Sequence, residues 1–329
     1  MMGKFKRVRI LVQVAIGVAI ILWLIQLADL SRVYSTILGM NPINIIIASS
    51  FFIVASFFVA LAFYVSLKRS HPTAPLRKVV MSSFAGQLLS DITPVRSGYF
   101  LTPFILNKLS DVPVERGMTG VLATGGVNSI VKVVLCLVGI AYFIRFLPLE
   151  PWIINALLVG ASFLLVAGLF LLLLMWEKRL SRLVEKFETL PLIGKSMHKL
   201  IEMFNNVQRE GQKVKGSLIQ VAVLILFSVI TNATALYSIS LTLWNSSLSI
   251  VDFFFMTSLA SALMYIPITI AGLGVQEAGY VVLLSLLLKL PLDPLDSTLV
   301  VFALITRVLF TGTDIIGIVP LLKVGLKYK

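Results

Sequence analysis

The sequence predicts an all-α integral membrane protein with about six transmembrane helices and two broken, re-entrant helical hairpins arranged as inverted-topology repeats. Hydrophobic residues make up 58% of the 329 residues and only 13% are charged, whereas about a quarter of the residues of a soluble domain are charged. The mean hydropathy is +0.99. Long apolar stretches recur along the chain, and proline and glycine interrupt two of them. We therefore expect residues 1–329 to form a single polytopic membrane domain.

The first apolar stretch, residues 10–28, follows a basic N-terminus that contains Lys4, Lys6, Arg7 and Arg9. It is longer than the core of a signal peptide and does not end in a small-x-small cleavage site, so we expect an uncleaved first span. Basic residues that precede a span favour the cytoplasmic side of the membrane. The sequence therefore predicts a cytoplasmic N-terminus.

The later apolar stretches supply the other spans and the two hairpins. They cover residues 43–67, 79–109, 118–146, 152–176, 218–243, 253–290 and 298–322. Two of them are long for a single span and contain helix-breaking residues, namely Pro94, Gly98 and Pro103 in 79–109 and Pro267, Gly272 and Gly274 in 253–290. A break at membrane depth requires protein or a water-filled cavity to satisfy the freed backbone groups. We expect two re-entrant hairpins; two ordinary helical hairpins are the alternative.

The distribution of Lys and Arg favours the re-entrant arrangement. If each hairpin enters and leaves on one side, most of the 28 Lys and Arg residues fall in cytoplasmic segments, as the positive-inside rule requires. Arg32, Arg145 and Lys289 remain on the opposite side. This topology places both termini in the cytoplasm, and we expect a multi-pass protein of the cell (plasma) membrane.

The same topology predicts two inverted halves. The first half, residues 1–175, contains hairpin 79–109, and the second half, residues 218–329, contains hairpin 253–290. Helices that flank the hairpins run in opposite senses in the two halves. Inverted repeats whose broken helices meet near the midplane are typical of transporters that work by alternating access.

Residues 176–217 form a basic connector between the halves. Its apolar positions include Leu180, Leu183, Val184 and Phe187, a spacing that fits an amphipathic helix on anionic lipid. Pro191 and Gly194 would divide it into two helices. A solvated connector explains the same pattern equally well.

Six ionisable residues lie at membrane depth: Asp91, Arg96, Lys132, Glu277, Arg307 and Asp314. Such residues are costly in a membrane and therefore indicate a functional site. Because three are basic and three are acidic, a set of structural ion pairs is the alternative. Arg307 and Asp314 are seven residues apart on one helix, share a face, and could support such a network.

The positions of the charges in the hairpins favour a site. Arg96 and Gly98 lie in the first break, where a helix that resumes would point free N–H groups and its positive dipole end into the cavity, as suits a phosphate. Arginine adds a bidentate fork for phosphate oxygens. The second break offers the backbone of Gly272 and Gly274 together with Glu277, which could bind a cationic headgroup or take up protons.

The helix after the first hairpin adds a further pair of candidates. Asn128 and Lys132 are four residues apart on one face, and Gly125 and Gly126 allow close packing one turn earlier. Lys132 could face the cavity or snorkel to an interface. Thr231 and Asn232 in stretch 218–243 are interpreted as interhelical hydrogen-bonding groups.

Catalytic and metal-binding patterns are weak in this sequence. The single cysteine, Cys136, lies in an apolar run, and His71 and His198 lie in basic stretches without metal-ligand spacing. There is no P-loop and no nucleophile elbow. We expect no catalytic residues, no metal and no cofactor. The net charge of +13 is read as the positive-inside signature, so no nucleic acid is expected as a partner.

The two hairpin tips resemble the signature stretches of the lysylphosphatidylglycerol synthase transmembrane-region family. The stretches are Pro94-Val95-Arg96-Ser97-Gly98 and residues 267–278, which contain Ala271-Gly272-Leu273-Gly274 and Glu277. The resemblance spans nearly the whole chain and implies a flippase-like integral membrane protein that moves a lipid between leaflets. We expect the stand-alone form, without an aminoacyltransferase domain.

These observations lead to a lipid translocase, flippase or scramblase-like, as the expected function. Its substrate would be a phospholipid or polyprenyl-phosphate lipid, and a homo-oligomer is possible. Arg96, Lys132 and Arg307 would hold the phosphate, while Asp91, Glu277 and Asp314 would balance charge or couple protons. A membrane enzyme that modifies a lipid headgroup and a non-transporting scaffold of a lipid-linked synthesis complex are the alternatives.

Overall fold

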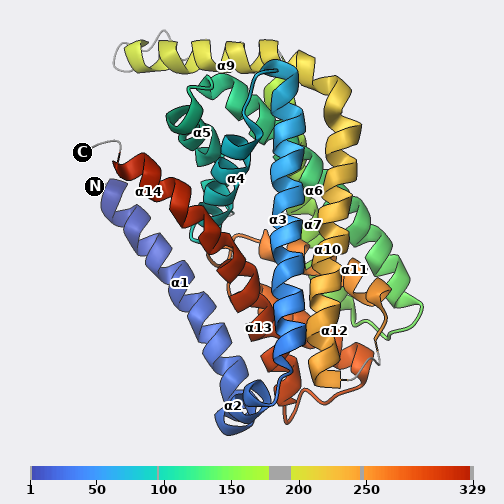
Figure 1. The fold of residues 1–329 in the computed structure, drawn as a ribbon. Helices are drawn as coiled ribbons and strands as arrows, with labels where there is room; N and C mark the ends of the chain where they lie inside the picture. The colour runs from blue at the N-terminus through green and yellow to red at the C-terminus, as the bar shows by residue number, and fades with distance from the viewer. Residues whose placement is uncertain (1, 95, 178–193, 245–247, 327–329) are drawn as a thin grey trace.

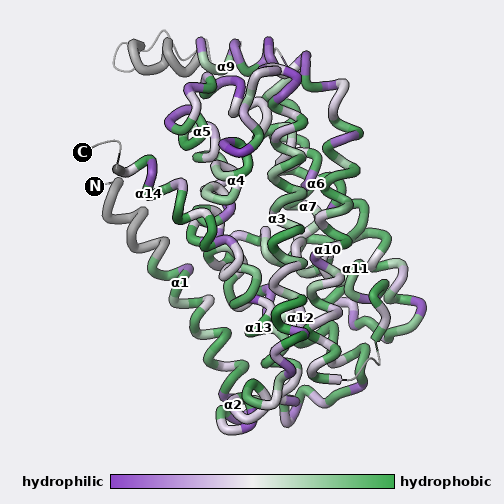
Figure 2. The backbone as a smooth tube through the Cα atoms, viewed as in Figure 1, coloured by the Kyte–Doolittle hydropathy of each residue, from purple (hydrophilic) through white to green (hydrophobic). Residues whose placement is uncertain are grey.

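The protein is an all-α integral membrane protein, as the sequence predicts. A computed structural model describes residues 2–94, 96–177, 194–244 and 248–326. In these ranges five helices are long and apolar enough to cross a membrane, or six when the bent pair at the N-terminus counts as one span. The bundle is largely hydrophobic, whereas hydrophilic residues gather at its ends and along the helix that lies across one end (Figure 2).

Figure 1 shows the described helices, coloured in chain order. They are α1 (Met2–Leu27), α2 (Leu30–Leu38), α3 (Pro42–Ser70), α4 (Leu76–Asp91), α5 (Thr102–Ser110), α6 (Val114–Ile144), α7 (Pro151–Trp176), α9 (Gly194–Val214), α10 (Leu218–Trp244), α11 (Ile250–Met264), α12 (Val275–Leu288), α13 (Ser297–Asp314) and α14 (Ile318–Leu326), with 3₁₀ turns η1 (Ser97–Leu101), η2 (Lys215–Ser217) and η3 (Ile315–Gly317).

The first apolar segment turns sharply at its end. Its parts Leu11–Leu27 and Leu30–Leu38 meet at 87°. The carboxylate of Asp29 accepts a hydrogen bond from the backbone N–H of Ser31 (3.0 Å) and caps the start of α2, which satisfies an otherwise unpaired N–H group. In Figure 1, α1 runs along the side of the bundle and α2 lies at its lower end.

Both long apolar stretches form broken hairpins. Stretch 79–109 contains α4, η1 and α5, and stretch 253–290 contains α11 and α12. With a rise of 1.5 Å per residue, the longest of these four helices measures about 24 Å, less than the hydrocarbon thickness of about 30 Å. The hairpins enter the bundle from opposite ends (Figure 1). Their tips meet inside it, where Pro94 and Ile270 form an antiparallel backbone bridge.

The long helices hold the two hairpins together. The helices α3 and α10 pack against each other, as do α6 and α7. Small residues allow this close approach: a Cβ atom added to Gly126 would lie 3.2 Å from the carbonyl oxygen of Gly168, so the expected tight packing at this glycine is present. Each hairpin follows a long helix and precedes another in the chain, α3 and α6 for the first and α10 and α13 for the second.

The helix α9 closes one end of the bundle (Figure 1). Val207 and Val214 are buried against Met175, and the indole N–H of Trp176 donates to the carbonyl of Gly211 (2.9 Å). α9 begins at Gly194, where the sequence predicts a new helix. The predicted preceding helix, with Leu180, Leu183, Val184 and Phe187, and Pro191 itself, lie outside the described residues.

Candidate functional site

The first tip closes its own backbone hydrogen bonds. The backbone N–H of Arg96 donates to the carbonyl of Thr93, and that of Ser97 to the carbonyl of Pro94. The N–H of Gly98 donates to the hydroxyl of Thr93 (2.7 Å), and the N–H of Tyr99 to the carbonyl of Arg96. The expectation of free N–H groups at this tip was therefore wrong, because the turn itself satisfies them. Binding of an anion here depends on side chains.

The side chain of Arg96 points away from this turn into the interior. Arg96 adopts a left-handed backbone conformation (φ 56°), which is uncommon for a residue with a Cβ. Its guanidinium pairs with Asp91 (2.9 Å), contacts the sulfur of Met264 in the second hairpin (3.9 Å), and lies 5.3 Å from the ring centroid of Phe310. Arg96 thus connects the first tip to α11 and α13.

The second tip is held by an ion pair between α12 and α13. The Arg307 Nε lies 3.2 Å from the Glu277 carboxylate, whose side chain is 1% exposed. The same guanidinium donates to the side-chain oxygen of Gln276 (3.2 Å) and to the backbone carbonyl of Ala271 (3.2 Å). The Glu277 carboxylate in turn accepts from the N–H of Gly274 (2.6 Å). The Gly274 N–H is therefore not open to a ligand.

The glycines of the tips act through their small size and backbone freedom. Gly272 and Gly274 have φ values of 70° and 82°, in the region that favours glycine. A Cβ atom added to Gly272 would lie 2.6 Å from the backbone of Met264. At Gly98 it would lie 2.3 Å from the carbonyl of Leu89. All three glycines therefore let backbones approach closely.

Asp314 does not interact with Arg307, although both lie on α13. Its carboxylate accepts a hydrogen bond from the hydroxyl of Ser56 on α3 (3.1 Å). It also interacts electrostatically with Asp91 and Arg96. One oxygen each of Asp91 and Asp314 is buried without a hydrogen-bond partner among the described residues. The structure thus places five of the six charges in two groups, Asp91, Arg96 and Asp314 at the first tip and Glu277 and Arg307 at the second.

Lys132 faces the interior, and no acidic residue within the described ranges forms an ion pair with it. Within the part of the chain that the structure describes, neither its ammonium group nor the side-chain amide of Asn128, one turn earlier on α6, makes a hydrogen bond, and Lys132 makes no ion pair. Both residues line the same cavity, so Lys132 does not snorkel to an interface. The positive charge of Arg96 repels that of Lys132.

A cavity of about 580 Å³ lies on the side of the first tip. Polar residues line the part near the tips, and hydrophobic residues, most of them from α6, α7 and α9, line the rest. The polar lining comprises Ser56, Gln87, Ser90, Arg96, Tyr99, Thr124, Asn128, Ser129, Lys132, Ser228, Asn232 and Tyr265, and the apolar lining includes Met118, Leu122, Phe170, Leu171, Leu174, Met203, Phe204 and Val207.

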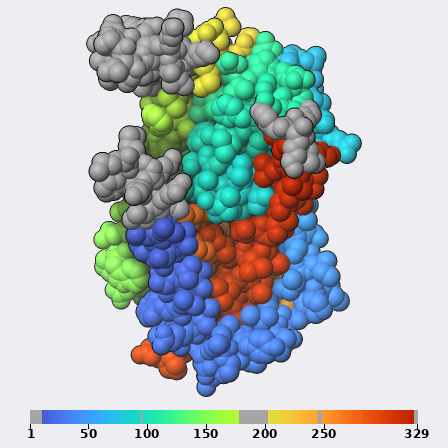
Figure 3. Space-filling view, turned by 90° about the vertical axis from the view of Figure 1, so that its left-hand side faces the viewer, coloured from blue at the N-terminus to red at the C-terminus, as the bar shows by residue number. Residues whose placement is uncertain are grey.

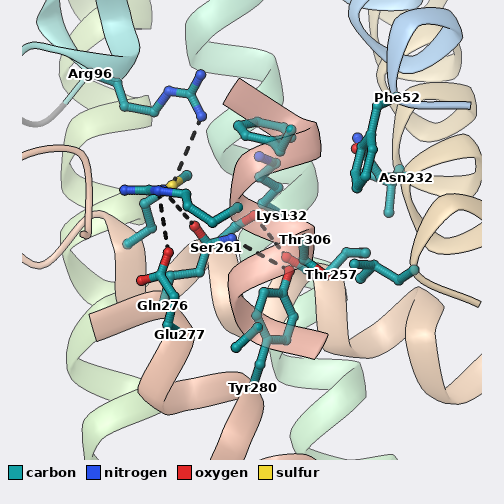
Figure 4. A pocket seen from close by; sticks show the side chains of 16 residues that line it. Phe52, Arg96, Lys132, Asn232, Thr257, Ser261, Gln276, Glu277, Tyr280 and Thr306 are labelled. Carbon is teal, nitrogen blue, oxygen red and sulfur yellow. Dashed lines mark hydrogen bonds and ion pairs between the residues drawn. The ribbon is translucent and has the colours of Figure 1, made fainter. Parts of the chain in front are cut away.

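A second cavity, of about 60 Å³, lies on the side of the second tip. Figure 4 shows Arg96 reaching toward it from one side and Gln276, Glu277 and Tyr280 from the other, with Lys132 between them. This volume has room for a few water molecules. Because Arg96, Lys132 and Asn232 line both cavities, they occupy the boundary between the two sides of the site.

Sequence reasoning missed several lining residues. Thr231 and Asn232 were expected to bond between helices, but both donate to carbonyls of their own helix, and Asn232 lines both cavities. Ser56 and Tyr265 carried no sequence signal, because an isolated hydroxyl in an apolar run is common. Gln276 lies beside Glu277 in the second break, and this adjacency was the only available signal.

Outside the spans, His71 is engaged by Arg116. The Nη1 of Arg116 lies 2.8 Å from the Nδ1 of His71. Burial and the positive charge of Arg116 lower the pKa of His71, so its neutral form is favoured. Among the described residues, no group of three or more His, Cys, Asp and Glu side chains could hold a metal ion.

Comparison with known proteins gives one family. Residues 10–313 match the family described as the lysylphosphatidylglycerol synthase TM region, and both hairpin tips lie within the matched range. No curated protein matches the chain.

Proposed function

Because the chain belongs to the lysylphosphatidylglycerol synthase transmembrane-region family, we propose that it is a lipid translocase that moves a phosphate-bearing lipid between the leaflets of the membrane. Membership of this family implies a lipid-related function in the membrane. The translocase activity and the phosphate-bearing substrate rest on the site between the two hairpin tips.

The observation that carries the proposal is the unpaired Lys132. An ammonium group taken out of water is costly unless an anion accompanies it. Arg96 adds a second positive charge on the same cavity wall. Arg96 pairs with Asp91 and also interacts with Asp314, whereas neither carboxylate lines this cavity beside Lys132. A phosphate that enters the cavity would supply the missing anion and accept hydrogen bonds from Lys132, Arg96 and Asn128.

The shape of the larger cavity supports a lipid rather than a free anion. Its charged end near the tips suits a headgroup, and its apolar wall of α6, α7 and α9 side chains suits the adjoining part of a hydrocarbon chain. The remainder of the acyl or isoprenoid tail would stay in the bilayer. Such a division matches the two ends of an amphipathic substrate.

Two cavities that share Arg96 and Lys132 support movement by alternating access. The larger cavity adjoins the first tip and the smaller one the second tip. We assign residues 1–175 and 218–329 as the two inverted halves, joined by connector 176–217. Transfer to the second side would require Arg307 to exchange its bonds with Gln276 and Ala271 for bonds to the phosphate. Glu277, Asp91 and Asp314 would balance the charges that remain.

We further propose that the protein lies in the plasma membrane with both termini in the cytoplasm. The basic residues of the N-terminus, of the connector and of the C-terminal tail support this orientation. Under this orientation the larger cavity adjoins the inner leaflet.

The decisive experiment is a flipping assay with the purified protein in liposomes that contain fluorescent phosphatidylglycerol. Lys132→Ala and Arg96→Ala should each slow flipping by about tenfold or more, because a hydrogen-bonded charge is lost from phosphate binding. Arg145→Ala, which removes an exposed cation from the end of the same helix as Lys132, serves as the matched control and should flip at the wild-type rate. Unchanged flipping in both site variants would overturn this site.

Lipid mass spectrometry of a deletion strain separates the proposal from its rivals. A leaflet imbalance with all lipid species present supports the translocase. A missing lipid species points to an enzyme that modifies a headgroup. An unchanged lipid composition in both leaflets points to a scaffold.

A further inference from the structure

The first span contacts the second tip directly, and sequence reasoning did not single out the residues involved. Among the residues of α1 whose burial is described, Gln13, Gly17 and Leu24 are buried and lie on one narrow stripe with helical spacing, which Ala28 continues just after the helix. Most other described side chains of α1 are exposed to the surroundings of the bundle. Figure 3 shows α1 in dark blue beside the orange and red surface of the second half. The buried stripe is therefore the face through which α1 contacts the rest of the protein.

Gln13 bonds to the backbone of the second break. Its side-chain Nε2 donates to the carbonyl of Pro267 (3.2 Å) across 254 positions of sequence. No backbone N–H in the described part of the chain donates to this carbonyl. Gln13 is only 5% exposed. Since a carbonyl left unpaired at membrane depth is costly, the amide of Gln13 satisfies a group that the Pro–Gly break frees.

Gly17 lets the two backbones touch one turn further along α1. A Cβ atom added to Gly17 would lie 2.8 Å from the carbonyl oxygen of Leu273, and one added to Gly274 would lie 2.7 Å from the carbonyl oxygen of Gly17. Both distances are too short for a real contact, so glycine is required on each side of this interface.

The second tip is therefore held from three directions. The Arg307 side chain of α13 binds the Ala271 carbonyl, Pro94 of the first tip pairs with Ile270, and α1 contributes Gln13 and Gly17. Arg307 lines the smaller cavity, whereas Gln13 and Gly17 line neither described cavity. A substitution at Gln13 or Gly17 can therefore alter the second tip without removing a residue that lines either cavity.

We propose that α1 positions the second tip, with Gln13 and Gly17 as its positioning residues. The effect on transport rests on the proposed translocase function, but the effect on the tip does not. Loss of either contact should loosen the tip backbone while Arg96 and Lys132 keep their places. Lipid binding should then be preserved and lipid movement slowed.

Hydrogen–deuterium exchange of the purified full-length protein in detergent tests the contact. The amides of Leu273, Gly274 and Gln276 are all hydrogen-bonded within the tip. Gln13→Leu and Gly17→Ala should each raise exchange in residues 266–276 by about tenfold, as expected for the loss of a buried hydrogen bond or for a steric clash. Gln26→Leu, an exposed glutamine on the same helix, and Gly312→Ala, whose added Cβ meets nothing within 4 Å, are the matched controls.

The flipping assay supplies the second readout. Gln13→Leu and Gly17→Ala should lower the maximal rate several-fold without changing the lipid mole fraction that gives half-maximal rate, whereas Lys132→Ala should raise that mole fraction. Unchanged exchange in both α1 variants overturns the proposal, as does raised exchange with an unchanged rate. If the wild type flips no lipid, the proposed function fails, while exchange still decides whether α1 holds the tip. If Gln13→Leu does not fold, Gly17→Ala decides alone.

Discussion

At the scale of single residues, the partners of the buried charges differ in kind. Glu277 and Arg307 satisfy each other and also bind backbone groups of the second tip. Lys132 has no such partner among the described residues. A closed pair meets the electrostatic needs of both its groups, whereas an open cation in a cavity still lacks an anion, which the proposed lipid phosphate would supply. The six ionisable residues are therefore neither one structural network nor one uniform ligand set.

The closed pair should show strong coupling in a double-mutant cycle. Glu277→Gln leaves the buried Arg307 without a counter-ion, and Arg307→Met does the same to Glu277, so each should cost about 3 kcal/mol of stability. The double variant should lose clearly less than the sum, because neither charge is then left unpaired. Thermal or denaturant unfolding in detergent measures the cycle. Additive losses would show that the two groups do not interact.

At the scale of elements, each hairpin depends on close contact between its tip and a helix. The first tip packs Gly98 against the last turn of α4, and the hydroxyl of Ser90 donates to the carbonyl of Arg96 (3.1 Å). These contacts fix the turn that carries Arg96. The left-handed conformation of Arg96 persists because the surrounding bonds hold it.

We expect Gly98→Ala to disrupt the first tip. The added methyl group would lie 2.3 Å from the backbone carbonyl of Leu89, and two backbones must move apart to admit it, at a cost of about 2 kcal/mol or more. The yield of monodisperse protein and its melting temperature should both fall. Gly216→Ala, whose Cβ would meet nothing within 4 Å, is the matched control. Equal stability of the two variants would contradict the packing role of Gly98.

Sequence alone located these hairpins but not their contacts. Pro94, Gly98 and Pro103 in one stretch and Pro267, Gly272 and Gly274 in the other marked the breaks, because no continuous helix accommodates such residues at that spacing. The direction of the freed N–H groups was predicted wrongly. The side chains of Thr93 and Glu277 accept hydrogen bonds from the backbone N–H groups of Gly98 and Gly274, respectively. A pattern of residue types does not show in which direction a side chain points.

At the scale of the whole molecule, the hairpins enter from opposite ends and their tips meet between the two cavities (Figure 1). The helix α9 closes the end from which the first hairpin enters, and Met203, Phe204 and Val207 of α9 line the larger cavity. The connector is thus part of the cavity wall as well as a link in the chain. Its described part packs on the bundle through one face.

The orientation of the molecule can be tested by cysteine labelling. In a Cys136→Ser background, Arg209→Cys on α9 and Arg145→Cys after α6 each place one thiol at an exposed position. With cytoplasmic termini, a membrane-impermeant maleimide should label Arg145→Cys in intact cells and Arg209→Cys only after permeabilisation. The reverse pattern would invert the topology and place the larger cavity at the outer leaflet.

The sequence by itself determined that the protein lies in a membrane, the approximate number of spans, the two broken hairpins and the set of ionisable residues at membrane depth. Each of these follows from local composition, because the bilayer acts on every residue according to its own polarity and on every helix according to its length. The tertiary structure alone decided the partners. Arg307 pairs with Glu277 and not with Asp314. Asp314 accepts a hydrogen bond from the hydroxyl of Ser56, and Gln13 donates one to the carbonyl of Pro267. Such choices depend on how distant helices rotate and pack, which no local pattern records.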